Sequence, residues 1–415
     1  MTNLETEIDE MVDDYWLQLG RRQDFNSDPA IFKYLEERFH HTYILGKPGG
    51  GKSTLLERMA YYDFSEGYSV IFIDPKGETV DRLYSLCENK EKIIYVSFKH
   101  PIGLSPFSRK DYSIDTIITE FVQILDILIT STSPNPESTV RMKEVLYKTL
   151  KGFDEKDRNF NFLAKFLNSK KIRDDYKFSN PEYTTWWLDL EKSTSSGYHK
   201  ASDFVRTMSS IESRISLFLE NDEMKQFIVS DNELSIDELV NSNKSLFVNC
   251  YSSSRDNVLF LVNLIVYAVY SYIFKSFNRK PLLIYIDEFQ LCASELFIDM
   301  LLFCRSFQVG FTLSHQNLYG IPKTLYDTIV DTVRNYVIFN CGYTEAKKFS
   351  DTFSLKPDDF LNLDKYYAWV RMGNKNTPIK TFPPLEVESI NIPPPHSNIL
   401  KSQYNFLKDG WITVS

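Results

Sequence analysis

The sequence predicts an α/β fold in which a mostly parallel central sheet is accompanied by an all-helical insertion. Short, continuously apolar runs alternate with helical patterns towards both ends of the chain, which is typical of parallel strands covered by helices on both faces. The middle of the chain instead holds long helical patterns with few β-branched runs. We therefore expect the helical part to interrupt one α/β domain.

The expected strands form two groups, one on each side of the helical stretch. In the first group, the runs HTYILG, YSVIFIDP and KIIYVSF occupy residues 41–46, 68–75 and 92–98. In the second group, the runs SLFVNCY, PLLIYIDEF, VGFTLSH and NYVIFNC occupy residues 245–251, 281–289, 309–315 and 335–341. Runs of this length, apolar throughout and separated by helical patterns, are expected to pair in parallel.

These patterns divide the chain into an interrupted α/β domain with flanking segments. The expected parts are an acidic helical segment at residues 1–30, the two halves of the α/β domain at 31–110 and 236–382, the all-helical insertion at 111–235, and a proline-rich tail at 383–415.

Composition and charge narrow the class of protein. The chain has 415 residues, of which 43% are hydrophobic, enough for two or three domains with a large core. Its net charge of −9 argues against a basic coat for nucleic acid but allows a local basic channel. The five scattered cysteines include no CxxC pair, which favours a reduced, cytosolic protein over a disulfide or metal framework.

The longest apolar run, residues 258–274, bears on membrane association. Asn263 interrupts the run, which is also shorter than the ~20 residues of a membrane span, so we expect a buried helix. The acidic N-terminus lacks the pattern of a signal peptide. We expect a soluble, cytoplasmic protein without stable membrane insertion.

A glycine-rich loop predicts a nucleotide site. The segment GKPGGGKS at residues 46–53 fits the P-loop pattern G-x-x-x-x-G-K-[ST], between an expected strand and an expected helix. Lys52 would reach the β- and γ-phosphates and Ser53 would ligate Mg²⁺, whereas the alternative is a plain turn before a surface helix. The predicted nucleotide-binding residues are Gly46, Lys47, Pro48, Gly49, Gly50, Gly51, Lys52, Ser53 and Thr54.

Adjacent acids at the end of the strand LLIYI predict the hydrolytic part of the site. Asp287 is our candidate magnesium ligand, and Glu288 is our candidate for the base that polarises the attacking water. The alternative is a solvated strand end, but acids that follow an apolar strand are costly unless a cation or water uses them. The doublet favours an ATP-hydrolysing motor.

A glutamine and two arginines complete the predicted chemistry. Gln316 follows another apolar strand and would sense the γ-phosphate or orient the water, unless it is an ordinary turn residue. Arg305 and Arg334 are candidates for an arginine finger offered to the ATP of a neighbouring subunit, or for structural arginines. A finger supplied in this way requires an oligomer.

Several of these motifs together resemble the HerA/FtsK superfamily of P-loop ATPases, and most of all the conjugative coupling proteins of the TraG/TraD type. The segments that carry the resemblance are DPKGE (74–78), IGLSPF (102–107), IDEFQ (286–290), SHQNL (314–318) and NYVIF (335–339). The resemblance implies a RecA-like P-loop NTPase domain, use of ATP and Mg²⁺, a homo-hexameric ring that pulls DNA through its pore, and Arg305 as the finger. Coupling proteins usually begin with transmembrane helices, and none is visible in this sequence.

The resemblance favours a DNA-translocating motor in conjugative transfer, viral DNA packaging or HerA-like DNA processing, with a relaxase, capsid or nuclease as possible partner. A protein-remodelling ATPase and a nucleotide-dependent switch or scaffold are the alternatives. Residues 141–206 hold fourteen Lys and Arg against ten Asp and Glu, most densely at 165–177. That stretch would line a DNA entrance or form a solvated helix face.

Overall fold

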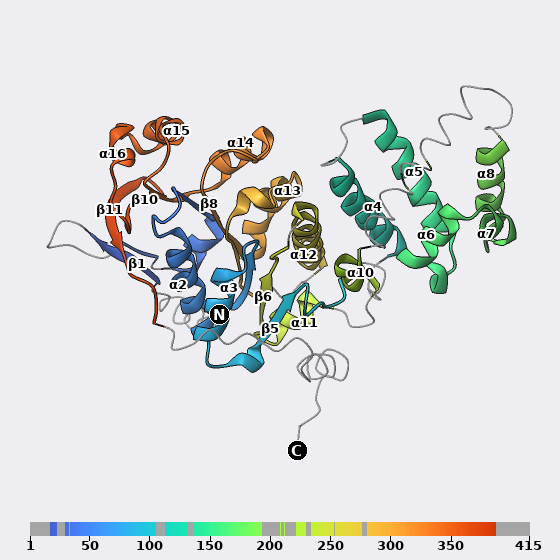
Figure 1. Cartoon of the computed structure of the whole chain (residues 1–415), viewed down its shortest axis with the longest axis horizontal. Helices are drawn as coiled ribbons and strands as arrows, with labels where there is room; N and C mark the ends of the chain where they lie inside the picture. The colour runs from blue at the N-terminus through green and yellow to red at the C-terminus, as the bar shows by residue number, and fades with distance from the viewer. Residues whose placement is uncertain are drawn as a thin grey trace, which may run out of the picture. The chain divides into compact units, whose positions relative to one another are not determined.

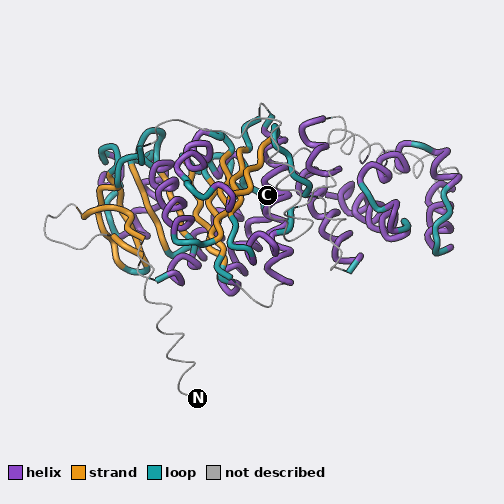
Figure 2. Tube along the Cα trace, turned by 90° about the horizontal axis from the view of Figure 1, so that it is seen from below, coloured by secondary structure: helices purple, strands orange, loops and turns teal. Residues whose placement is uncertain are grey.

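The computed structural model describes most of the chain and divides it into two compact units. The described residues are 17–22, 30–32, 34–104, 113–130, 136–192, 208, 211, 221–229, 234–252, 254–275 and 280–386. The first unit is drawn from residues 1–100, 235–262 and 269–415, and the second from 101–234 and 263–268. Figure 2 shows the described strands gathered in the first unit, with helices and loops in the second.

One sheet of eleven strands forms the centre of the described part of the first unit, in the order β2-β1-β11-β10-β9-β3-β8-β7-β4-β6-β5. In Figure 1, β10 and β11 lie towards one side of this sheet and β5 and β6 towards the other. The seven strands from β9 to β5 all run parallel to one another. They are β3 (Thr42–Leu45), β4 (Ser69–Asp74), β5 (Ile93–Ser97), β6 (Ser245–Asn249), β7 (Leu282–Ile286), β8 (Val309–His315) and β9 (Asn335–Phe339). Each predicted strand corresponds to one of these, so the predicted mostly parallel α/β fold is confirmed.

An antiparallel extension beyond β9 was not part of the prediction. Its strands are β10 (Tyr367–Met372), β11 (Lys375–Thr381), β1 (Leu17–Arg22) and β2 (Ala30–Phe32). β10 and β11 form a hairpin at Gly373, which adopts a φ of 56° that suits glycine. In both strands, buried positions mostly alternate with partly or fully exposed ones, whereas the parallel strands are buried almost throughout.

Residues 17–22 form β1 instead of the helix expected throughout residues 1–30. Leu17 and Leu19 are buried whereas Gln18 is exposed, and this period of two is that of a strand. Pairing with β11 fixes the segment in the sheet, and the acidic composition gave no signal of that partner. The remainder of the expected helical segment, apart from Ala30, lies outside the described residues.

Helices cover both faces of the parallel part of the sheet. They are α2 (Lys52–Ser65), α3 (Glu78–Leu86), α11 (Ile236–Asn241), α12 (Arg255–Lys275), α13 (Leu296–Phe303), α14 (Lys323–Thr332), α15 (Tyr343–Phe353) and α16 (Asp358–Leu361). α2 and α3 share an apolar core with Phe72 and Tyr285 of the sheet. On the other face, Phe297 of α13 contacts Phe311 of β8 with ring centroids 6.3 Å apart. These layers bury the strands, as their apolar sequence predicts.

The long apolar run predicted as a buried helix lies in α12. Its stretch Arg255–Ile273 is long and apolar enough to cross a membrane by length and composition, but 83% of the most apolar window is buried in the structure. Asn263, which interrupts the run, is 1% exposed. This burial is that of a core helix.

The described residues of the second unit are helical, as predicted for the insertion. The helices are α4 (Ile114–Thr130), α5 (Pro136–Gly152), α6 (Phe160–Asn168), α7 (Lys170–Asp175), α8 (Pro181–Lys192) and α10 (Asp222–Val229). Aromatic rings fill the space between α5, α6 and α8: Phe153 contacts Phe166 at 5.0 Å, and Phe166 contacts the buried Trp187 at 5.2 Å, between ring centroids. Trp187 is therefore a core residue.

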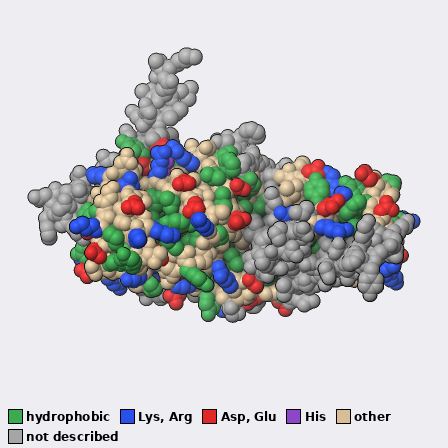
Figure 3. Space-filling view, turned by 90° about the horizontal axis from the view of Figure 1, so that it is seen from above, with side chains coloured by type: hydrophobic (Ala, Val, Ile, Leu, Met, Phe, Trp, Pro, Cys, Tyr) green, Lys and Arg blue, Asp and Glu red, His purple; other side chains and the backbone are tan. Residues whose placement is uncertain are grey.

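The basic segment at residues 165–177 spans the end of α6 and all of α7. Arg173 forms an ion pair with Glu191 at 2.8 Å and donates to the carbonyl oxygens of Phe166 and Leu167. Its guanidinium is thus committed to internal contacts. On the face drawn in Figure 3, Lys and Arg side chains are interspersed with Asp and Glu.

Candidate functional site

Three neighbouring strands bring the predicted site residues to one edge of the sheet. β3 pairs with β8 and β8 with β7, so that Leu313 lies opposite Ile286. The glycine-rich loop follows β3, Asp287 follows β7 and Gln316 follows β8. Because the three strands are parallel, their carboxyl ends lie together, which is where ligands bind in open α/β sheets.

The glycine-rich loop has a backbone that requires its glycines. Gly49 and Gly51 have φ angles of 79° and 115°, in the left-handed region. A Cβ atom on Gly51 would also lie 2.7 Å from the ring of Tyr366. The loop closes on itself where the Gly50 N–H donates to the Lys47 carbonyl oxygen at 3.3 Å. The loop leads directly into α2, whose N-terminus favours negative charge.

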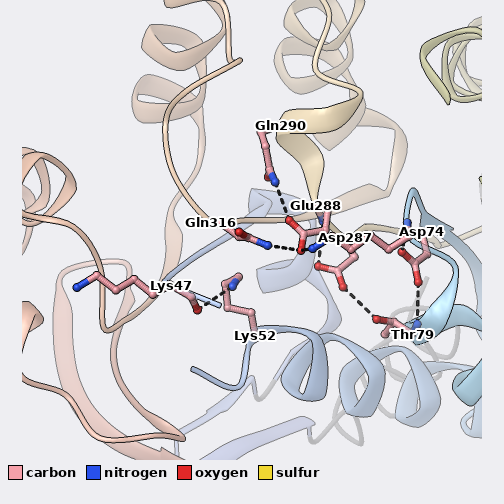
Figure 4. Close-up of polar contacts among 9 residues, drawn as sticks. Lys47, Lys52, Asp74, Thr79, Asp287, Glu288, Gln290 and Gln316 are labelled. Carbon is pink, nitrogen blue, oxygen red and sulfur yellow. Dashed lines mark hydrogen bonds and ion pairs between the residues drawn. The ribbon is translucent and has the colours of Figure 1, made fainter. Parts of the chain in front are cut away.

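Lys52 is the first residue of α2 and is 5% exposed. Its Nζ donates to the carbonyl oxygen of Lys47 at 3.1 Å (Figure 4), and among the described residues this is the one acceptor it has. Burial lowers the pKa of Lys52, while the charges of Glu288 and Asp287 oppose that shift. A buried ammonium with N–H groups to spare is suited to phosphate oxygens.

Asp287 and Glu288 follow β7 and are 2% and 5% exposed. The Asp287 Oδ2 accepts a hydrogen bond from the Thr79 hydroxyl at 3.1 Å, and its Oδ1 accepts from the Glu288 N–H at 2.9 Å. Glu288 has a φ of 46°, a left-handed conformation uncommon for a residue with a side chain. Such backbone conformations cluster at functional sites, where the surrounding structure holds them.

Side chains from two strand ends and from the next turn hold Glu288. Its Oε1 accepts from Lys76 and from Gln316, and its Oε2 accepts from Gln290 at 2.6 Å. Figure 4 shows the side chains of Gln290 and Gln316 pointing towards Glu288. Burial alone would raise the pKa of Glu288, but the hydrogen bonds from Lys76, Gln290 and Gln316 lower it below its usual value. Glu288 is therefore a carboxylate, and Gln316 lies directly beside it.

Asp74 organises the loop after β4. Its Oδ1 accepts from the Lys76 N–H at 2.8 Å, and its Oδ2 accepts from the N–H groups of Thr79 and Val80 at 2.8 and 3.1 Å. Burial and then the neighbouring Asp287 raise the pKa of Asp74 to about 6. The fixed loop places Thr79 against Asp287 and Lys76 against Glu288.

Arg305 and Arg334 lie at the opposite edge of the sheet. Arg305 is in the turn before β8, and Arg334 directly precedes β9, where its N–H donates to the His40 carbonyl oxygen at 3.1 Å. Both are exposed, and both lower the pKa of His40 after the larger effect of burial. Within one chain, neither arginine belongs to the site built around Lys52.

The residues present fit a nucleotide with Mg²⁺. The buried ammonium of Lys52 and the glycine loop suit a polyphosphate, and the Ser53 hydroxyl and Asp287 carboxylate are oxygen ligands of the type Mg²⁺ prefers. Within the described residues, no cluster of three or more His, Cys, Asp or Glu could hold a metal ion. Mg²⁺ in nucleotide sites usually binds through one or two carboxylates, water and phosphate oxygens.

Sequence reasoning gave no role to Lys76, Thr79, Gln290 or Asp74. Asp74, Lys76 and Gln290 lie in the DPKGE and IDEFQ motifs, which carried the resemblance but no assigned chemistry, and Thr79 directly follows DPKGE. Their contacts join positions far apart in the chain, as between Lys76 and Glu288. The motifs were the available signal, and only the fold shows which side chains meet.

Comparison with known proteins gives the family and the fold. Residues 20–269 match the family described as "Helicase HerA, central domain". No curated protein sequence matches the chain. The bacterial conjugative coupling protein TrwBdeltaN70 in its unbound form has a similar structure, with a TM-score of 0.66, 15% identity and 92% of each chain covered.

Two further solved structures have this fold. The plasmid coupling protein TrwB in complex with ADP and Mg²⁺ has a TM-score of 0.64 and 17% identity, covering 87% of this chain and 88% of its own. VirB4 of Thermoanaerobacter pseudethanolicus has a TM-score of 0.61 and 14% identity, covering 89% of this chain and 97% of its own. The family match spans more than half of the sequence, and the chain therefore belongs to the helicase HerA central-domain family of P-loop ATPases.

Proposed function

We propose that this chain hydrolyses ATP with Mg²⁺ and uses the energy to translocate DNA as a homo-hexameric ring in the cytoplasm. The observation that carries the proposal is the convergence of Lys52, Asp287, Glu288 and Gln316 at one edge of the sheet. A solved structure of the same fold is described as a complex with ADP and Mg²⁺, and another as a conjugative coupling protein.

In this proposal each side chain has a defined task. Lys52 binds the β- and γ-phosphate oxygens, and Ser53 and Asp287 hold Mg²⁺, which neutralises phosphate charge when bound. Glu288 accepts a proton from the attacking water, and Gln316 orients that water. Arg305 of a neighbouring subunit would stabilise the charge that develops on the γ-phosphate.

Translocation of DNA is proposed because the chain belongs to the HerA central-domain family. The process that the translocation serves would be conjugative DNA transfer, viral DNA packaging or HerA-like DNA processing. A relaxase, a capsid protein or a nuclease would be the corresponding partner.

ATP hydrolysis is to be measured with Mg²⁺ alone, with single-stranded oligonucleotides and with duplexes. We expect stimulation by DNA, and displacement of a third strand from a triplex would report translocation. If neither single-stranded nor duplex DNA changes the rate of ATP hydrolysis, a protein-remodelling ATPase or a nucleotide-dependent switch is favoured instead.

Two variants test the assigned chemistry. Lys52→Ala should abolish turnover by removing the phosphate-binding ammonium, whereas the exposed Lys99→Ala should leave it unchanged. Glu288→Gln should bind ATP without hydrolysing it and stabilise the ring, as measured by sedimentation with ATP. Normal turnover in Glu288→Gln would remove Glu288 from the mechanism.

A further inference from the structure

Three donors of the protein itself hold the carboxylate of Glu288 in this structure. Lys76 and Gln316 both donate to Oε1, and Gln290 donates to Oε2 at 2.6 Å. A general base has to offer a lone pair to the water that it activates. The two donors on Oε1 occupy both of its lone pairs, so this oxygen cannot accept a proton from water until one donor leaves.

We propose that Lys76 is a positioning residue that holds Glu288 in this paired resting state until a nucleic-acid backbone draws the lysine away. The inference rests on the proposed function, because it explains how DNA would regulate that same site. It assigns the hydrolysis switch to the loop after β4, which sequence reasoning left without a role.

The loop fixes the backbone of Lys76 and leaves its side chain accessible. The Lys76 N–H donates to Asp74 at 2.8 Å, and the N–H groups of Thr79 and Val80 donate to the other oxygen of the same carboxylate. The Lys76 side chain is 52% exposed, whereas the Glu288 side chain is 6% exposed. A phosphate arriving from solvent can therefore compete for the ammonium while the loop stays in place.

The second donor to Glu288 also belongs to a loop with an exposed end. Gln316 is followed three residues later by Tyr319, which is 89% exposed. The adjacent Gly320 lies near the exposed Arg255, whose Nη2 would be 3.8 Å from a Cβ atom on that glycine. The loop also lies against η5 (Phe289–Leu291), because the same Cβ atom would be 3.2 Å from the Gln290 carbonyl oxygen.

The chemistry of these exposed groups favours nucleic acid as the partner. Tyr319 offers a ring on which a base can stack, and Arg255 and Lys76 offer cations for backbone phosphates. An acidic peptide would satisfy the cations but would leave the aromatic ring unused. All three side chains follow the carboxyl ends of strands in the group β8-β7-β4-β6, at the edge that holds Glu288.

Lys76→Met tests the inference, because it removes the charge and nearly keeps the side-chain volume. We expect DNA-free turnover to rise about tenfold, the factor that corresponds to one lost charge-assisted hydrogen bond, and stimulation by DNA to fall towards unity. Lys76→Arg keeps the charge and should retain stimulation. Lys92→Met is the matched control, because Lys92 is exposed at the amino end of β5, and it should behave as the wild type.

Two further measurements separate this role from a merely structural one. Affinity for a fluorescent ATP analogue should be unchanged in Lys76→Met, and weaker binding would overturn the inference by making Lys76 a nucleotide ligand. In a Glu288→Gln background, Lys76→Met should give no further gain in turnover. A gain in that background would show that Lys76 acts elsewhere.

The outcomes distinguish this inference from the proposed function. If single- or double-stranded oligonucleotides stimulate the wild type and Lys76→Met is stimulated equally, the inference is wrong and the proposed function stands. An equal loss of turnover with and without DNA also overturns it. If DNA does not stimulate the wild type, the proposed DNA function fails, and nucleic acid is not the ligand of this switch.

Discussion

Two clusters of buried charge occupy the same layers of the sheet and differ in how completely they are paired. In the inner cluster, Arg38 and Asp63 are 1% and 0% exposed and form an ion pair at 3.3 Å. Arg38 also donates to the Tyr285 hydroxyl at 2.8 Å and to the Thr312 hydroxyl at 3.2 Å. This cluster joins the turn before β3, the helix α2 and the strands β7 and β8 by contacts within the protein.

The cluster at the carboxyl edge is left open by comparison. Lys52 is as deeply buried as many core residues, yet within the described chain its ammonium has one backbone acceptor. Asp287 and Glu288 lie nearby with donors that a ligand can replace. The comparison teaches that burial of a charge alone does not mark a site. A site is marked by buried charge whose pairing the protein leaves incomplete.

The largest expected effect concerns Arg305, which lies at the edge far from the open cluster. Arg305→Ala should lower kcat by about 10³-fold or more, as loss of an arginine finger does. Arg334→Ala should have a small effect, and both side chains are exposed, so neither change should unfold the protein. Mixing Arg305→Ala subunits with Lys52→Ala subunits should restore part of the turnover. Equal effects of the two arginine variants would reject our choice between them.

Breaking the inner cluster, whose charges are paired within the protein, should lower the free energy of unfolding. Asp63→Ala leaves Arg38 buried without its carboxylate, and we expect the free energy of unfolding to fall by about 3–5 kcal/mol. Lys52→Met removes an incompletely paired charge and should change that free energy far less, although it abolishes turnover. Urea denaturation of both variants checks the comparison. If Lys52→Met lowers the free energy of unfolding more than Asp63→Ala does, the distinction between the inner cluster and the cluster at the carboxyl edge is wrong.

The stability of the protein should also fall in acid because of buried histidines. Burial lowers the pKa of His41 to about 4, although a hydrogen bond to the Leu301 carbonyl opposes that shift. In the unfolded chain, His41 has an ordinary pKa of about 6.5 and is protonated as the pH falls below that value, whereas in the folded chain it stays neutral down to about pH 4. The free energy of unfolding should therefore drop by about 2 kcal/mol between pH 6.5 and 5.

His41→Gln is the control for this pH dependence, because it keeps a donor and an acceptor but does not titrate. Its stability should fall less steeply over the same range. His315, whose pKa burial also lowers to about 4, accounts for part of the slope that remains. Identical slopes in His41→Gln and the wild type would show that His41 does not contribute.

The smallest expected effect concerns the hydrogen bond by which Thr79 orients the Asp287 carboxylate. Thr79→Val removes the hydroxyl that donates to Asp287 at 3.1 Å and keeps the shape of the side chain. We expect a loss of about 1 kcal/mol, seen as about a fivefold higher Mg²⁺ concentration for half-maximal turnover. Thr328→Val, on the exposed face of α14, should leave that concentration unchanged. No shift in Thr79→Val would mean that the hydroxyl does not orient the carboxylate.

The parallel part of the fold was predictable because its signals are local. Each strand from β3 to β9 is a continuous apolar run, and the glycine loop has a pattern whose backbone demands are known. β10 and β11 were not predicted because about half of their residues are partly or fully exposed. β1 was not predicted because it pairs with β11, which is far from it in the sequence. Strands that are buried on only one face give a weaker sequence signal than strands buried on both faces.

The positions of the candidate site residues were predictable from the sequence, but the contacts between their side chains were not. Lys52, Asp287 and Gln316 stood at strand ends, so a parallel sheet had to bring them to one edge. Which donors touch Glu288 depends on how the loop after β4 folds, and the clamp by Asp74 on Lys76 sets that fold. No local pattern reports a contact between side chains this far apart in sequence.

The pairing of β1 with β11 has a consequence for synthesis. Gly20 lies opposite Thr381 in the finished sheet, so β1 cannot pair with β11 until the long stretch of chain between them has been synthesised. Until then its unpaired edge and the apolar side chains of Leu17 and Leu19 remain available to other chains. Completion of this edge is therefore a late step of folding, and the nascent protein would benefit from a chaperone during that interval.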